Sequence, residues 1–388
     1  MNVLTINGGS SSIKFAVFLD GGDRSLTGKI ERIGLPDALF SARFSAGNKK
    51  DEFKIAAPDF NAAGAFLLDW LAKHIDFSTL AGIGHRVVHG GAKFSEPQRI
   101  DDAVLAELRA ISPYDPEHLP AEIALVELFR QRLPNLPQVA CFDTAFHRTM
   151  PAVARILPIP RRYFESGVQR YGFHGLSYTY LMQELERLAG RDAAQGRVIL
   201  AHFGNGASLA AVKDGRCIDT SMGFTPTAGM PMGTRSGNLD PGLVYYLART
   251  EQMTAEQFEA MVNHESGLKG VSETGSDMRD LIAKESSDPR AKDAVDLFCY
   301  EARKWIGAYA AALGGLDTLV FAGGIGEHGH EIRERICQNL KHLGIELEEQ
   351  RNKTNAPLIS KDASRVAVRV IPTDEEIVIA KATRKIAS

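Results

Sequence analysis

Two segments, residues 3–18 and 198–212, share one order of parts: an apolar run, a polar turn with two glycines, and a second apolar run. The first turn is Asn7-Gly8-Gly9 and the second is Gly204-Asn205-Gly206. Apolar runs on both sides of such turns predict strand hairpins. A repeat this far apart is too long for a solenoid, so the chain is expected to contain a duplicated domain.

The first turn has two possible roles. Glycine lets the backbone approach a ligand closely, and the amides and hydroxyls of residues 8–12 can all donate hydrogen bonds to an anion. The turn could therefore cradle phosphate, although the order of residues in a P-loop is absent. The alternative is an ordinary hairpin turn built from turn-forming residues. The turn alone does not decide between the two.

Length and composition limit the class of protein. With 388 residues, two or three domains are expected, and 44% hydrophobic with 24% charged residues is typical of a globular protein. A net charge of -3 gives no electrostatic footprint for nucleic acid or an anionic membrane, so small-molecule partners are expected. The apolar segment at residues 305–316 is too short to span a membrane. Without an export signal, and with four scattered cysteines, a cytoplasmic location without disulfides or structural zinc is predicted.

Several polar residues stand in positions that suit anion chemistry. Arg86 lies in a short predicted strand at residues 82–91 and could clamp a carboxylate or phosphate, or form a surface salt bridge. Arg235 lies in a long, non-periodic segment at residues 221–240, which is typical of a functional loop. Asp143 follows a predicted strand, where it could take part in chemistry, cap the next helix, or do both.

The remaining pattern predicts an α/β fold. A helix is expected over residues 293–313, a buried strand over 318–322, and then a glycine loop that leads into a helix near Glu331. Such a strand, loop and helix can admit a nucleotide next to the backbone. An acidic turn at residues 372–376 and a closing helix at 377–385 follow near the end of the chain. Together these parts suit phosphoryl transfer with a magnesium ion, because its transition state spreads negative charge over oxygens.

Five motifs stand in order along the chain: Asn7-Gly8-Gly9-Ser10-Ser11-Ser12-Ile13-Lys14, Gly84-His85-Arg86-Val87-Val88-His89-Gly90-Gly91, Phe142-Asp143-Thr144-Ala145-Phe146-His147, Tyr171-Gly172-Phe173-His174-Gly175 and Met232-Gly233-Thr234-Arg235-Ser236-Gly237. Together they resemble the acetate kinase family, which belongs to the superfamily of sugar kinases, actin and heat-shock ATPases. The resemblance implies two duplicated actin-like (ribonuclease H-like) α/β domains with an interdomain active-site cleft, working as a homodimer. The domains would cover residues 1–147 with 376–388, and residues 148–375, the second carrying the nucleotide site.

The reaction that the resemblance implies is reversible transfer of a phosphoryl group between ATP and acetate, giving acetyl phosphate and ADP, with Mg²⁺ or Mn²⁺. The implied catalytic residues are Arg86, Asp143, His174 and Arg235. The implied acyl pocket adds Val88, Phe173 and Pro226, and the implied metal residues are Asn7 and Glu375. The phosphates and nucleotide would contact Ser10, Ser12, Lys14, His202, Asn205, Gly206, Asp277, Met278, Arg279, Gly324, Ile325 and His328.

The chain departs from the family pattern at a few positions. Tyr114 stands in place of the family's usual pocket-edge histidine. Tyr178, three residues beyond the fourth motif, stands where the family pattern ends in histidine, and His328 stands where it has asparagine. A propionate or other short-chain carboxylate kinase is therefore an alternative to an acetate kinase. An alternative of another class is a nucleotide-gated ATPase that uses no carboxylate acceptor.

Overall fold

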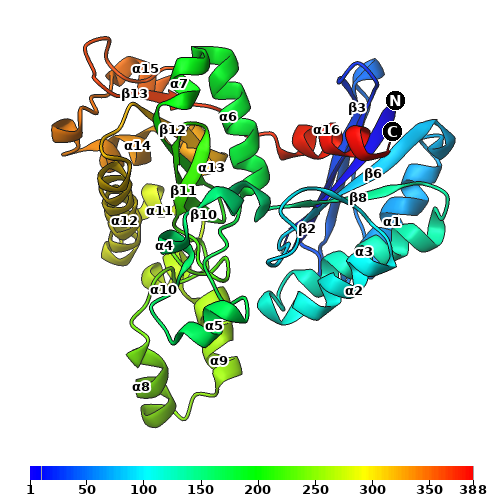
Figure 1. Cartoon of the computed structure of the whole chain (residues 1–388), viewed down its shortest axis with the longest axis horizontal. Coiled ribbons are helices and arrows are strands. Elements are labelled where there is room, and N and C mark those ends of the chain that lie inside the picture. Colours follow the sequence, from blue (N-terminus) through cyan, green and yellow to red (C-terminus); the bar gives the residue numbers. More distant parts are fainter. Residues whose placement is uncertain (10, 388) are drawn as a thin grey trace. The chain divides into compact units, whose positions relative to one another are not determined.

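The computed structural model describes residues 1–9 and 11–387. The chain forms two compact units: unit 1 comprises Met1–Phe146 with Asp374–Ser388, and unit 2 comprises His147–Thr373. The predicted domain division lies one residue later at the first boundary and two residues later at the second. Each unit is α/β, with one sheet and packed helices (Figure 1).

In the described part of unit 1, eight strands form a sheet of order β5-β4-β3-β2-β1-β6-β8-β7. β1 and β2 pair antiparallel on either side of the first glycine turn, as the hairpin prediction requires, and β6 joins β1 in parallel. The elements are β1 (Asn2–Gly8), β2 (Ser12–Phe18), β3 (Arg24–Glu31), β4 (Leu39–Phe44), β5 (Lys50–Lys54), α1 (Phe60–Ala72), β6 (Leu80–Val87), β7 (Gln98–Arg99), α2 (Asp102–Ile111), α3 (Leu119–Arg132), β8 (Gln138–Phe142) and α16 (Glu375–Ala387).

Helices cover both faces of this sheet, as the side chains of β6 show, because they point alternately to one face and the other. A Cβ at Gly84 would lie 2.1 Å from Thr383 Oγ1, so the absence of a side chain lets α16 pack directly on the strand. The neighbouring residue Ile83 belongs to the apolar core with Leu67 of α1 and Phe129 of α3. Successive side chains of a strand point to opposite faces, which places α16 on one face and the pair α1 and α3 on the other.

In the described part of unit 2, five strands have the order β11-β10-β9-β12-β13. Three antiparallel strands followed by two parallel ones repeat the pattern of β3-β2-β1-β6-β8, which confirms the predicted duplication. The elements are α4 (Ala152–Arg155), α5 (Arg161–Glu165), α6 (Gly175–Ala189), α7 (Arg191–Gln195), β9 (Arg197–Phe203), β10 (Ala207–Lys213), β11 (Arg216–Thr220), α8 (Gly242–Thr250), α9 (Ala255–Ala260), α10 (Gly267–Ser272), α11 (Met278–Lys284), α12 (Pro289–Leu313), β12 (Thr318–Ala322), α13 (Gly323–His328), α14 (His330–Cys337), α15 (Glu349–Lys353) and β13 (Ala367–Val370).

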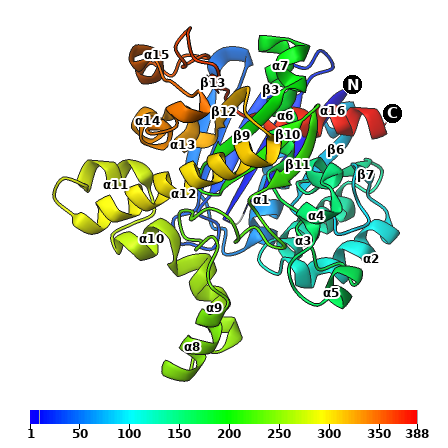
Figure 2. The same cartoon turned by 60° about the vertical axis from the view of Figure 1, so that its left-hand side comes forward.

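The helices α6 and α12 lie on opposite faces of the second sheet (Figures 1 and 2). On β9, His202 forms a hydrogen bond with Ser177 of α6, while the next residue, Phe203, packs against Phe298 of α12. Residues 221–240 contain no helix or strand, as predicted for a functional loop. No helix in the described ranges has the length and apolarity needed to cross a membrane.

Candidate active site

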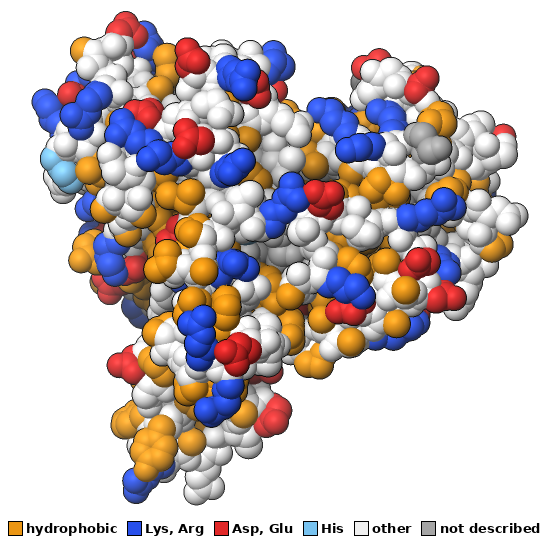
Figure 3. Space-filling model, in the orientation of Figure 1, with side chains coloured by type: hydrophobic (Ala, Val, Ile, Leu, Met, Phe, Trp, Pro, Cys, Tyr) orange, Lys and Arg blue, Asp and Glu red, His pale blue; other side chains and the backbone are white. Residues whose placement is uncertain are grey.

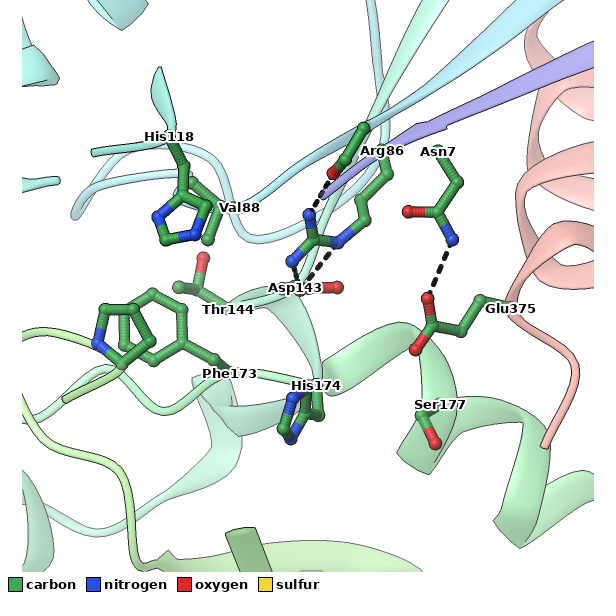
Figure 4. Close-up of polar contacts among 12 residues, drawn as sticks. Asn7, Arg86, Val88, His118, Asp143, Thr144, Phe173, His174, Ser177 and Glu375 are labelled. Atoms are coloured by element: carbon green, nitrogen blue, oxygen red, sulfur yellow. Dashed lines mark hydrogen bonds and ion pairs between the residues drawn. The ribbon is translucent and has the colours of Figure 1, made fainter. Parts of the chain in front are cut away.

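In unit 1, Arg86 lies near the end of β6 and is held by acidic side chains (Figure 4). Its Nε and Nη2 atoms donate to Asp143 Oδ2 at 3.0 and 2.7 Å, and Nη1 donates to Glu122 Oε1 at 3.2 Å. Nη1 also donates to the carbonyl of Gly8, at the end of β1. The side chain is only 13% exposed, so the interpretation as a surface salt bridge is wrong. Arg86 is a buried, oriented cation beside the first glycine turn.

The charges around Arg86 are strongly coupled. Burial alone would lower the pKa of Arg86, but the carboxylates of Asp143, Glu122 and Glu375 outweigh burial and raise it, so the guanidinium stays charged. Burial also raises the pKa of Glu122 to about 8, against the opposing effects of Arg86 and of the Val88 amide. Glu122 is therefore a proton-binding group in the neutral range, in direct contact with Arg86.

Glu122 was not predicted from the sequence. Its Oε2 accepts a hydrogen bond from the backbone amide of Val88 at 2.8 Å, so one carboxyl group holds two predicted substrate residues, Arg86 and Val88. Within α3 it lies in helical spacing with buried apolar residues of the helix, whereas the side chain of Glu127 is 33% exposed. Helical periodicity therefore indicates burial of Glu122 but gives no signal for its contacts with Arg86 and Val88.

His118 is a second residue that sequence reasoning missed. It is buried, and its Nδ1 lies 2.8 Å from Asp115 Oδ1. In the view of Figure 4, His118, Val88 and Thr144 lie on the same side of Arg86. The spacing of Asp115 and His118, three residues apart at the start of a helix, was the available signal. Tyr114 instead packs edge-on against His89, with ring centroids 5.6 Å apart.

Asn7 and two glutamates form an oxygen-rich group at the start of α16. Asn7 Nδ2 donates to Glu375 Oε2 at 2.9 Å and to Glu376 Oε1 at 3.3 Å (Figure 4 shows the first bond). Both glutamates lie in the first turn of the helix, not in a turn before it as predicted. Burial, followed by repulsion from Glu375, raises the pKa of Glu376. Carboxylate and amide oxygens are the donor types that Mg²⁺ prefers, so this group fits a magnesium ion.

The described residues contain no cluster of three or more histidine, cysteine, aspartate or glutamate side chains that could hold a metal alone. A magnesium ion here would need oxygens from water and substrate phosphates, as is usual for this metal. Lys14 pairs in register with Asn7 across the hairpin, and Ser12 begins β2. Ser10, predicted to contact phosphate, lies outside the described residues.

In unit 2, His174 occupies a backbone conformation that is unusual for a side-chain-bearing residue, with φ of 59° just before α6. The preceding carbonyl, that of Phe173, accepts a hydrogen bond from His147 Nε2 at 2.9 Å. Burial lowers the pKa of His147 to about 4, so this imidazole is neutral and Nε2 must carry the proton it donates. Such strained conformations persist where surrounding contacts hold them, often at functional sites.

The second glycine turn lies next to the side chains of His174 and Arg235. A Cβ at Gly206 would lie 3.1 Å from His174 Nε2 and 3.9 Å from Arg235 Nη1, so both donors face this glycine. The His174 ring stacks on His202 with centroids 4.3 Å apart. Asn205 accepts a hydrogen bond from the Gly233 amide through its carbonyl. The structure thus brings these predicted residues of β9, the turn and the long loop together.

Further predicted residues lie near the same turn or away from it. Arg235 Nη1 lies 3.5 Å from the carbonyl of Pro226, which joins two predicted residues of the long loop. A Cβ at Gly204 would be 4.0 Å from the Gly324 amide, so α13 starts next to the turn. The predicted glycine loop is wrong: residues 323–328 are themselves helical and carry Gly324, Ile325 and His328.

Asp277, Met278 and Arg279 form a separate group at the start of α11. The Asp277 side chain caps the helix by accepting a hydrogen bond from the Arg279 amide at 2.9 Å, and it also accepts one from the Arg279 guanidinium. Met278 is buried. The described side-chain hydrogen bonds of Asp277 and Arg279 join these two residues to each other. Nothing in the described contacts ties them to α13.

The chain is similar to known proteins over almost its whole length. The model of the Acetokinase family matches residues 2–381. The chain is 43% identical over 387 residues to an acetate kinase of Bacillus cytotoxicus, covering 98% of this chain and 97% of the relative. The crystal structure of Porphyromonas gingivalis acetate kinase matches with a TM-score of 0.89 at 37% identity, over the full length of both chains. A propionate kinase from Francisella tularensis matches with a TM-score of 0.93 at 34% identity, over 99% of each chain. The chain therefore belongs to the Acetokinase family.

Proposed function

We propose that this protein acts as an acetate kinase, transferring a phosphoryl group reversibly between ATP and acetate to give acetyl phosphate and ADP. The observation that carries the proposal is the 43% identity to acetate kinases over almost the whole length of both chains. Arg86 in unit 1, and Arg235 with His174 in unit 2, support it, because phosphoryl transfer is catalysed mainly by positioned cations and hydrogen-bond donors.

Arg86 and Arg235 bind the carboxylate and the migrating phosphoryl group, and His174 donates a hydrogen bond to the phosphoryl oxygens. An acetate-sized ligand has little apolar area, so its binding must rest on charge pairing. Asp143 orients Arg86, since two of the guanidinium's hydrogen bonds go to its Oδ2 atom. The attacking carboxylate oxygen needs no general base, because it is already ionised at neutral pH.

Asn7 and Glu375 hold the magnesium ion, which neutralises charge on the nucleotide phosphates when it is bound. Ser10, Ser12 and Lys14 contact the phosphates from the first turn, and His202, Asn205 and Gly206 contact them from the second. Asp277 to Arg279 and Gly324 to His328 bind the adenosine. We assign the nucleotide site to the predicted second domain, residues 148–375, and keep residues 1–147 with 376–388 as the first.

Val88, Phe173 and Pro226 line the acyl pocket and set the length of the acyl chain. Val88 and Phe173 are buried, which favours a small acyl group. Since one methylene in an apolar pocket changes binding by only about 1–3 kcal/mol, acetate is preferred over propionate and propionate is still used. Rates with acetate, propionate and butyrate at saturating ATP measure this preference.

The functional form is a cytoplasmic homodimer. The supporting observation is α8, a helix without a buried residue in the described chain, on which Leu243, Val244, Tyr245 and Tyr246 are 37–67% exposed. Figure 3 shows hydrophobic side chains gathered over this helix at the lower end of the view. Exposed apolar patches of this kind are typical of protein interfaces. Sedimentation of the wild type and of a Val244→Asp variant tests the dimer.

The decisive experiment traps the product. Purified protein is incubated with ATP, Mg²⁺ and acetate, and acyl phosphate is captured with hydroxylamine as the hydroxamate. We expect hydroxamate that depends on all three reagents. Hydrolysis of ATP at the same rate without acetate, and without hydroxamate, would instead favour the nucleotide-gated ATPase.

A further inference from the structure

Each of the two stacked histidines of unit 2 is tied by its Nδ1 atom to a buried serine. His174 Nδ1 lies 2.8 Å from Ser208 Oγ, and His202 Nδ1 lies 2.8 Å from Ser177 Oγ. Both serines are fully buried. The arrangement is crossed, because Ser177 of α6 holds the histidine of β9 while Ser208 of β10 holds the histidine that precedes α6.

The chain of hydroxyls on the His174 side continues to Tyr178. The phenol oxygen of Tyr178 forms a short hydrogen bond with Ser208 Oγ, and Tyr178 is fully buried one turn into α6. Its ring lies edge-on to that of His174, with centroids 6.4 Å apart. Tyr178 is one of the positions at which the chain departs from the family pattern.

We infer that the chain Tyr178, Ser208, His174 is a positioning relay that keeps the proton of the His174 imidazole on Nε2, the atom that faces Gly206 and Arg235. This inference rests on the proposed function, in which His174 donates a hydrogen bond to the transferred phosphoryl group. Tyr178 and Ser208 are positioning residues, since they act through His174 and not on the substrate.

The direction of the relay follows from acidity. A phenol is more acidic than an aliphatic alcohol and is the better hydrogen-bond donor, so Tyr178 donates to Ser208 Oγ. Ser208 then directs its own proton to His174 Nδ1, which must accept. In a neutral imidazole the other nitrogen carries the hydrogen, so Nε2 is the donor. Burial also raises the pKa of Tyr178, which keeps the phenol protonated and able to donate.

The geometry places that donor where it is needed. A methyl group at Gly206 would be 3.1 Å from Nε2 and 3.9 Å from Arg235 Nη1, so the open space above this glycine is shared by both groups. With the proton on Nδ1 instead, Nε2 would present a lone pair to an incoming anion. The relay therefore decides whether His174 attracts or repels the phosphoryl oxygens.

The test uses Tyr178→Phe and Ser208→Ala in the full-length protein. Long-range ¹H–¹⁵N spectra of the histidine rings report the tautomer of His174, whose signals are assigned by their loss in His174→Gln. We expect the Nε2–H form in the wild type and a mixture of tautomers in both variants. Turnover should fall roughly 3- to 10-fold in each, with the KM for acetate and for ATP within about twofold. The double variant should be no slower than Ser208→Ala, because the relay is already broken there.

Tyr309→Phe is the matched control. Tyr309 is another buried tyrosine of unit 2, and within the described residues its hydroxyl has no hydrogen-bond partner, so turnover and tautomer should not change. An Nδ1–H form of His174 in the wild type would overturn the relay, as would wild-type turnover in Tyr178→Phe. If the wild type makes no acyl phosphate, the proposed function fails instead, and the spectra still decide the tautomer independently.

Discussion

Replacing Gly206 with alanine tests the convergence of His174 and Arg235 most directly. Gly206 lies in the turn between β9 and β10, and its φ is outside the left-handed region, so an alanine causes no backbone strain. The added methyl would lie 3.1 Å from His174 Nε2, 3.4 Å from Cε1 and 3.9 Å from Arg235 Nη1. Unstrained contacts between carbon and such atoms begin near 3.4 Å, so the imidazole must move by a few tenths of an ångström.

The magnitude follows from what the methyl covers. A hydrogen bond to a charged group contributes about 1.5–3 kcal/mol, and about 1.4 kcal/mol corresponds to a factor of ten in rate. Loss of the bond from His174 to the phosphoryl group should therefore lower kcat by about 10- to 150-fold. The methyl touches no core residue among the three nearest atoms, so the melting temperature should stay within a few degrees of the wild type.

The assay is the hydroxylamine trap at saturating acetate and ATP, together with thermal unfolding. Gly307→Ala is the control, because a Cβ at this position of α12 meets nothing within 4 Å. That variant should keep full activity and gain up to about 1 kcal/mol of stability from better helix propensity. A kcat of Gly206→Ala within twofold of the wild type would refute the assignment of His174 and Arg235 to one catalytic spot.

Four other predictions follow from the described contacts. Arg86→Lys keeps the charge but loses the paired bonds to one carboxylate, so turnover should fall at least about 100-fold, and half-normal activity would contradict the role. Folding raises the pKa of Glu122 from 4.5 to about 8, so the folded state holds this proton more tightly than the unfolded state does. The unfolding free energy of the wild type, relative to that of Glu122→Gln, should therefore fall by up to about 5 kcal/mol between pH 4.5 and 8. The same pH dependence of unfolding free energy in both proteins would exclude this. Arg333 donates to the carbonyls of residues 326 and 327 at the end of α13, the helix proposed to bind adenosine. Arg333→Lys should therefore raise the KM for ATP about tenfold and leave kcat within twofold of the wild type. An unchanged KM would show that this contact does not support nucleotide binding. Glu375→Gln should raise the Mg²⁺ concentration for half-maximal rate about tenfold, and an unchanged metal titration would remove Glu375 from the metal site.

Local patterns in the sequence determined the frame of this protein. The hairpins at residues 3–18 and 198–212 were predictable because alternating apolar runs and glycine turns act over a few residues. The duplicated sheet followed from their repetition, and β12 agrees with its predicted bounds residue for residue. The candidate site residues came from motifs whose members are close in the chain.

Local sequence patterns predicted the wrong conformation for two segments that contact other parts of the chain. Residues 323–328 contain three glycines and were expected to form a loop, yet they are helical, and the buried Arg333 binds the carbonyls at the end of that helix. Glutamates 375 and 376 were placed in a turn, yet they begin α16, where Asn7 donates to both. Asn7 is 368 residues away from Glu375, so at α16 a partner distant in the sequence favours a conformation that local propensity does not. At α13 the partner lies one element further along the chain, in α14.

Tertiary structure alone decided which polar groups support the site. Glu122 contacts Arg86 across 36 residues, and Ser208 contacts His174 across 34, and no pattern within their own helix or strand indicates either partner. A hydrogen bond depends on the positions and directions of two groups to within fractions of an ångström, and packing of separate elements sets those positions. The sequence by itself determined the repeated fold and the motifs that resemble the family, because both rest on short-range patterns. The hydrogen-bond partners of Arg86 and His174 were decided only when the sheets and helices packed together.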